Sequence, residues 1–213
     1  MTLNGLLIEP RLLLASKSPR RRRMLREAGV RFEVLDAGVD DGRLDARGKS
    51  AAAWVVALAY LKARAGLEAW RANGVAEPAV ILGADTVVAL EDELIGQPRD
   101  AGHARTIIER LEDRRHEVLT GVALLDSGAG KRRLMVDRAA VDVGVIGPER
   151  IEAYVASGRW AGKAGAYNLC EQVEAGWPIS WQGDPGTVMG LPMRRLAPWL
   201  AEFVAAGAAE APA

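Results

Sequence analysis

Residues 12–25 read LLLASKSPRRRRML, a short apolar run followed directly by two hydroxyl side chains, a proline and four arginines. The apolar run is long enough for a buried strand, and the residues after it predict a helix. Ser18 suits the N-cap, and Pro19 suits the first helical position, where its missing N–H costs nothing. Apolar residues from Met24 onward fall on one helical face, and Gly29 offers a stop. The segment therefore predicts a strand that leads directly into a helix N-terminus.

This junction carries the groups of an anion site. Backbone N–H groups, the helix dipole and guanidinium groups all favour phosphate there. Two other interpretations of the arginines at 20–23 stay open, namely a solvated helix face and a basic patch for nucleic acid. From this segment alone we favour phosphate, then the solvated face, then nucleic acid.

The charge and cysteine content narrow the class of protein. The chain has 213 residues with 28 Lys and Arg against 28 Asp and Glu, whereas a dedicated nucleic-acid binder usually carries a basic excess. One cysteine, Cys170, excludes an internal disulfide and suits a reducing compartment. The chain has no apolar run of about 18 residues and its start lacks the regions of a signal peptide. We therefore expect a cytoplasmic protein without a membrane span.

Hydrophobic periodicity predicts a mixture of strands and helices. Strands are expected near residues 32–35, 80–90, 116–125, 133–145 and 179–181, and helices near 50–73, 100–111, 151–156 and after Pro192. In the long helix, the spacing of Trp54, Leu58, Leu61 and Ala65 predicts a buried face. The mixture predicts an α/β fold with a mixed sheet. We expect one domain over residues 11–204, after an extension over 1–10 and before a disordered tail over 205–213.

Asp85 is the sharpest candidate for chemistry because it interrupts an otherwise apolar strand. A carboxylate there must be solvated, paired or metal-bound. A metal ligand and a base for a water nucleophile are both compatible roles, and a structural role stays open. Lys62 and Lys163 are each candidates for a phosphate contact or for plain surface. The two histidines lack the spacing of zinc ligands, and there is no Walker loop.

Segments spread over residues 12–200 resemble, in order, the Maf family of septum-formation-inhibitor-like nucleoside triphosphate pyrophosphatases. The matching segments are LASKSPRR (14–21), FEV with an acidic loop (32–42), Lys62-Ala63, GADTVV (83–88), HEVLTGV (116–122), GKAGAY (162–167) and GLP (190–192). Each segment alone is weak evidence for the family, but their occurrence in the same order makes the resemblance specific.

The resemblance implies a twisted mixed β-sheet flanked by helices around a deep nucleotide cleft. It also implies hydrolysis between the α- and β-phosphates of a nucleotide, with a divalent cation, Mg²⁺ or Mn²⁺. By similarity, Asp85 would activate water beside the metal, and Glu33 would help at the metal or sugar side. The substrate would be held by Ser16, Arg20, Arg21, Lys62, Gln97 and Lys163. Arg22 and Arg23 are expected to be solvated.

Two departures from the family pattern bear on activity and base preference. Gln97 stands where the family often has a lysine, so a charge is missing there. Cys170 stands where the pyrimidine branch usually has a glutamine. A nearby glutamate and an Asp-Pro pair are closer to the 7-methyl-GTP branch, whereas the Lys-Ala-Gly-Ala-Tyr segment is closer to the dTTP/UTP branch. The base preference stays open.

The leading hypothesis is a pyrophosphatase for modified or surplus nucleoside triphosphates. The alternative is a nucleotide-sensing or cell-division-regulating interaction protein with weak or vestigial hydrolysis, motivated by the missing cation at Gln97. RNA binding through the arginines is the least favoured because the overall charge is balanced. We expect no stable nucleic-acid or membrane binding, and a homodimer is what the family suggests.

Overall fold

The computed structural model describes residues 11–36, 38–39, 46–74, 77–91, 93–128 and 130–209, with side chains as far as residue 203. The chain divides into two compact units. The first unit comprises Met1–Asp85, Gly121–Val136 and Gly190–Ala213, and the second comprises Thr86–Thr120 and Asp137–Met189. Each unit is described by itself below.

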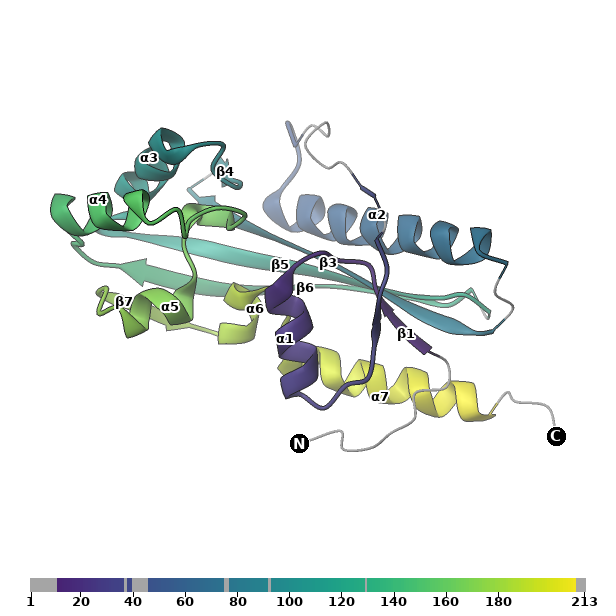
Figure 1. The fold of residues 1–213 in the computed structure, drawn as a ribbon. Helices are drawn as coiled ribbons and strands as arrows, with labels where there is room; N and C mark the ends of the chain where they lie inside the picture. The colour runs from purple at the N-terminus through teal and green to yellow at the C-terminus, as the bar shows by residue number, and fades with distance from the viewer. Residues whose placement is uncertain are drawn as a thin grey trace. The chain divides into compact units, whose positions relative to one another are not determined.

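Strands and helices are interspersed along the chain (Figure 1). In order they are β1 (Arg11–Leu14), α1 (Pro19–Glu27), β2 (Glu33–Val34), α2 (Ala51–Ala72), β3 (Ala79–Leu90), β4 (Glu93–Ile95), α3 (Ala101–Leu111), β5 (Arg114–Asp126), β6 (Arg132–Val143), α4 (Pro148–Ala156), the 3₁₀ turn η2 (Ala164–Ala166), α5 (Leu169–Glu174), β7 (Ile179–Gln182), α6 (Pro185–Met189) and α7 (Met193–Ala209). The predicted strands and helices are confirmed, whereas the short helices α5 and α6 were not predicted. α7 continues to Ala209 through Pro198, five residues into the predicted tail.

The strands described in the structure form a seven-stranded sheet with the order β2-β1-β3-β5-β6-β7 and with β4 paired to β3. β1 is parallel to both β2 and β3, whereas β4 and β7 pair antiparallel with β3 and β6. This mixture of directions confirms the predicted α/β fold with a mixed sheet. No helix in the described part of the chain is both long and apolar enough to cross a bilayer.

The core of the first unit has two layers because successive strand residues point to opposite faces of the sheet. One face packs against α2, and the other against α1 and α7 (Figure 1). The α2 layer includes Leu13, Ala59, Ala63, Ile81 and Ala123, and the opposite layer includes Leu12, Leu14, Leu25, Leu82, Val122, Leu124 and Leu196.

The buried face of α2 differs from the prediction. Leu58 is buried as expected, but Leu61 is 38% exposed, and Ala59 and Ala63 are fully buried instead. The reason is close backbone packing beneath the helix. A Cβ added to Gly83 would lie 2.3 Å from the carbonyl oxygen of Ala59, so only small residues fit where helix and strand meet.

In the second unit, α3 begins after its N-cap, Asp100, whose side chain accepts a hydrogen bond from the His103 N–H. Buried residues of α3 and α4 form the apolar interior on their side of the unit. His116 of β5 is buried, and its Nε2 lies 2.8 Å from the hydroxyl oxygen of Tyr167. Burial lowers the pKa of His116 to about 4 and raises the pKa of Tyr167, so both side chains are neutral near pH 7.

Gly121 offers a test of the contact between α2 and the sheet. A Cβ at this position would lie 2.4 Å from the carbonyl oxygen of Val55, which belongs to helix backbone and has no room to move. We expect Gly121→Ala to lower the free energy of unfolding by about 3 kcal/mol, the upper range for overpacking. Urea denaturation measures the change. Gly96→Ala is the matched control, because nothing lies within 4 Å of its added Cβ. Equal stability of the two variants would refute the contact.

His116 predicts a specific pH dependence of stability. An unfolded histidine has a pKa of about 6.5, so between about pH 6.5 and 4 the unfolded chain binds a proton that the folded protein does not. The stabilising effect is complete above that range and is lost as the pH falls through it. We expect His116 to account for a loss of about 2 kcal/mol between pH 7 and pH 5.

Chemical denaturation of wild type and His116→Gln at the two pH values measures this contribution. His116→Gln should lose less stability than wild type on acidification, whereas the matched variant His103→Gln should behave as wild type. The same pH dependence in all three proteins would rule out His116 as its source.

Candidate functional site

The strand-to-helix junction at residues 12–25 folds as its sequence predicts. β1 ends at Leu14, and Pro19 opens α1. Ser18 is the N-cap, and its hydroxyl oxygen accepts a hydrogen bond from the Arg21 N–H. Gly29 follows the end of the helix with a φ of 71°. The junction therefore places the first turn of α1 directly after the carboxyl end of a buried parallel strand, a position that suits anion binding.

Arg21 is turned into the protein, with 8% of its surface exposed. Its Nε donates to the carbonyl oxygen of Gly190 at 3.0 Å, and its Nη1 donates to the Ser16 hydroxyl at 3.2 Å. Arg21 therefore joins the β1–α1 junction to the Gly-Leu-Pro segment that precedes α7. These contacts fix Ser16 and give Arg21 a structural part beside any role at a ligand.

The other arginines of the cluster differ in exposure. Arg20 and Arg22 are half-buried, and Arg23 is exposed and pairs with Glu27 at 3.6 Å. The exposure of Arg23 agrees with its expected solvated position. Arg22 departs from that expectation because it is only partly exposed and its Nε atom is buried.

Lys62 and Asp85 form a largely buried ion pair in the first unit. The Nζ of Lys62 lies 2.6 Å from Oδ1 of Asp85, and the side chains are only 17% and 13% exposed. Asp85 is two residues after Gly83 in β3, so both face α2. The close packing at Gly83 therefore brings the α2 lysine to the carboxylate. A shielded pair of this kind can hold a proton acceptor in a fixed position.

A pocket of about 400 Å³ opens beside this pair in the first unit. It is lined by Ala15, Ser16, Lys17, Asp36, Gly38, Val39 and Lys62. Two of the lining residues, Lys17 and Asp36, form an ion pair at 2.9 Å, and both of their side chains are exposed. The hydrogen bond from Lys17, followed by one from the Gly38 N–H, holds the pKa of Asp36 below its usual range. Two lysines, a hydroxyl and a carboxylate thus share one hollow. Residues 37 and 40–42 of the predicted acidic loop lie outside the described part of the chain.

Glu33 does not join this group of residues. It lies on the short strand β2, and its carboxylate pairs with Arg11 at 2.8 Å, with both side chains about half exposed. It does not line the described pocket. Across the described residues, no group of three or more His, Cys, Asp and Glu side chains could hold a metal ion with protein ligands alone.

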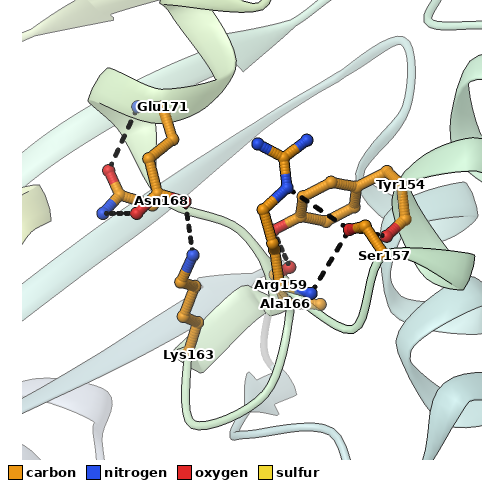
Figure 2. Close-up of polar contacts among 7 residues, drawn as sticks. All are labelled: Tyr154, Ser157, Arg159, Lys163, Ala166, Asn168 and Glu171. Carbon is orange, nitrogen blue, oxygen red and sulfur yellow. Dashed lines mark hydrogen bonds and ion pairs between the residues drawn. The ribbon is translucent and has the colours of Figure 1, made fainter.

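The remaining two predicted site residues, Gln97 and Lys163, belong to the second unit. The Gly165 N–H donates to the Gly96 carbonyl at 3.1 Å, which brings the exposed Gln97 segment to the Gly-Lys-Ala-Gly-Ala-Tyr segment. The Tyr154 hydroxyl of α4 donates to the Ala166 carbonyl of this segment at 3.1 Å (Figure 2).

The positive charge of Lys163 is compensated by the carboxylate of Glu171. Its Nζ lies 2.6 Å from Oε2 of Glu171, and Asn168 donates from Nδ2 to Oε1 of the same carboxylate at 2.9 Å (Figure 2). Asn168 also caps α5 by accepting from the Glu171 N–H at 3.3 Å. Sequence reasoning missed this pair, although an Asn followed three residues later by a Glu is the spacing of a capping box.

Comparison with known proteins identifies the family of this chain. The sequence profile of the Maf-like protein family matches residues 11–203. The dTTP/UTP pyrophosphatase of Salinibacter ruber is 40% identical over 185 residues, which is 87% of this chain and 87% of that protein. The dTTP/UTP pyrophosphatases of Pelotomaculum thermopropionicum and Symbiobacterium thermophilum are 36% and 38% identical over 90% of this chain, and over 96% and 93% of their own lengths.

The matched region contains the β1–α1 junction, the Lys62–Asp85 pair and the loop of Lys163, and it ends within α7. Profile and relatives thus cover the same elements that carry the polar residues described above. The chain belongs to the Maf-like protein family.

Proposed function

We propose that this protein is a nucleoside triphosphate pyrophosphatase that hydrolyses the bond between the α- and β-phosphates. The observation that carries this proposal is the shielded Lys62–Asp85 pair beside a hollow that holds Ser16 and Lys17. The relatives named dTTP/UTP pyrophosphatase support the same reaction and favour pyrimidine nucleotides as the substrates. Because the proposed substrate is an intracellular nucleotide, we also propose that the protein is cytoplasmic.

In the proposed mechanism, Lys62 acts first and Asp85 acts second. A triphosphate attracts the Lys62 ammonium, and Asp85 is then able to accept a proton at its carboxylate from a water molecule. The water oxygen forms a bond to the α-phosphorus as the bond to the β-phosphate oxygen breaks, which yields a nucleoside monophosphate and pyrophosphate. Ser16 and Lys17 bind phosphate oxygens and orient the chain of phosphates for this displacement.

A divalent cation fits the carboxylates of this unit, because Mg²⁺ is usually bound by one or two carboxylates together with substrate phosphates. Asp85 would hold it, since its carboxylate is the one placed with Lys62 beside the hollow. The pairing of Glu33 with Arg11 makes Glu33 the weaker of the two predicted ligands. When bound, the cation neutralises phosphate charge and polarises the phosphoryl group.

Asp85→Asn tests whether Asp85 is the general base of the reaction, and a panel of nucleotides tests which nucleobase the enzyme prefers. We expect this isosteric change to reduce pyrophosphate release by at least about 100-fold, the usual contribution of a general base. Release is measured with Mg²⁺ and with Mn²⁺ over dTTP, UTP, the other canonical triphosphates and 7-methyl-GTP. Asp142→Asn is the matched control, since Asp142 is a half-exposed carboxylate of β6 that pairs with Arg115.

Wild-type turnover by a folded Asp85→Asn protein would remove Asp85 from the mechanism. Nucleotide binding by the wild-type protein without pyrophosphate release would instead favour a nucleotide-sensing protein. The missing lysine at Gln97 is the feature that motivates that second candidate.

Glu171→Gln tests whether Lys163 contacts the substrate. The substitution keeps the hydrogen-bonding shape but removes the charge that compensates Lys163. If Lys163 binds phosphate, the KM for dTTP should fall about 3- to 10-fold with an unchanged kcat, the effect of roughly 1 kcal/mol of added attraction. Glu174→Gln on the same helix is the matched control. An unchanged or higher KM in Glu171→Gln would place Lys163 away from the phosphates.

A further inference from the structure

We infer that the outer edge of β7 is an interaction surface for a second copy of this chain, which pairs with it antiparallel through its own β7. In the described sheet, β7 (Ile179–Gln182) is the last strand in the order and pairs with β6 alone. β7 and the part of β6 that pairs with it lie within the second unit. The inference goes beyond the proposed function and does not depend on it, because β7 contains none of the residues proposed for the reaction.

The register of β6 and β7 shows which backbone groups of β7 face outward. The two strands are antiparallel, with Val143 opposite Ile179. One position earlier in β7, the Gly144 N–H donates to the Pro178 carbonyl at 2.7 Å. Hydrogen-bonded and non-bonded positions alternate along an antiparallel pair. Pro178 therefore faces β6, whereas Ile179 and Trp181 turn their backbone N–H and C=O groups away from it.

Most of these outward groups are available to another strand. The Ile179 N–H donates locally, to the Trp177 carbonyl at 2.8 Å. Within the part of the chain that the structure describes, the Ile179 carbonyl and both backbone groups of Trp181 have no hydrogen-bond partner. A row of unpaired donors and acceptors at the edge of a sheet is a template for pairing with a further strand.

β7 lacks the features that protect the other edge strands. β2 is two residues long, and its Glu33 pairs with Arg11, while the three-residue β4 carries Glu93, which pairs with Arg110. Very short strands and charged side chains discourage pairing at an edge. β7 reads ISWQ, with no charged residue and no proline, and Trp181 is 39% exposed. Because tryptophan is a frequent anchor of protein interfaces, this edge is suited to association.

The charges beside β7 favour a second copy over a strongly charged partner. Arg115 contacts Asp142 at 3.4 Å and Gln182 at 2.9 Å. On the same face of the sheet, Arg138 and Glu117 pair at 3.9 Å. This face therefore carries both signs in equal number, and a two-fold interface requires a surface that is complementary to itself. The whole chain has 28 basic and 28 acidic residues, so two copies do not repel each other through net charge.

The outward groups select the register between the two copies. When Trp181 lies opposite Trp181 of the second copy, the N–H of each donates to the C=O of the other. Ser180 then lies opposite Gln182 of the second copy, so polar side chains meet on the polar face. The two-fold axis passes between the two Trp181 residues. One substitution at this position therefore places two identical side chains directly opposite each other.

Sedimentation velocity of the full chain, from about 1 to about 300 μM, tests this interface over the range in which a small interface becomes populated. We expect the wild-type protein to pass from monomer to dimer as its concentration rises. Trp181→Lys and Trp181→Glu should each weaken dimerisation at least about 10-fold, because like charges directly opposite are destabilising. An equimolar mixture of the two variants should recover dimers, because lysine then faces glutamate. Val34→Lys is the matched control, since Val34 is 43% exposed on the opposite edge strand, β2.

Trp181→Pro is a second variant, because the Trp181 N–H faces outward and proline removes it without removing a hydrogen bond to β6. This variant should keep a cooperative thermal unfolding transition and remain monomeric. A wild-type protein that stays monomeric throughout the concentration range would overturn the inference. Association of folded Trp181→Lys or Trp181→Pro at the wild-type level, or a Lys and Glu mixture that stays monomeric, would also overturn it. Each of these results would leave the proposed function standing, and an inactive protein would leave the interface standing.

Discussion

The close approach of α2 to the sheet is the constraint on which the candidate site depends. Gly83 leaves no side chain between β3 and the backbone of α2, and Ala59 and Ala63 complete the contact from the helix. This distance is what allows Lys62 to reach Asp85 within 2.6 Å and to compensate a carboxylate that is only 13% exposed. A bare carboxylate at that depth would be costly, so the helix contact and the charge pair are parts of one solution.

Within the arginine cluster, the contacts described for Arg21 belong to the fold. Arg21 uses its Nε and Nη1 inside the protein, where they fix Ser16 and the Gly190 carbonyl. That arrangement stabilises the junction before any ligand arrives. The pocket beside it is lined instead by Lys17 and Lys62. Lysine ammonium groups are compact charges on flexible stems, which would suit the phosphate contacts proposed for these two side chains.

The sequence predicted the regular elements well where local chemistry is explicit. Ser18 was recognisable as an N-cap and accepts the expected backbone hydrogen bond, and Ser50 and Asp100 cap α2 and α3 in the same way. The buried face of α2 was mispredicted because large apolar residues were taken as the core, whereas tight packing on Gly83 selects small ones. α5 and α6 were missed because six and five residues are too short for a periodic pattern. Contacts such as Thr187 with Asp137 join residues distant in sequence, and no local pattern encodes them.

Gln97 and Glu171 act in the same direction on the charge of the second unit. Gln97 removes a cation that the family often has, and Glu171 compensates the one at Lys163. In the first unit, Lys62 and Lys17 are also paired, each with one carboxylate. Under the proposed function, a triphosphate would compete with these carboxylates for the lysines. Binding would then exchange existing ion pairs for new ones, and a divalent cation held by Asp85 and the phosphates would lower that cost by compensating the carboxylate.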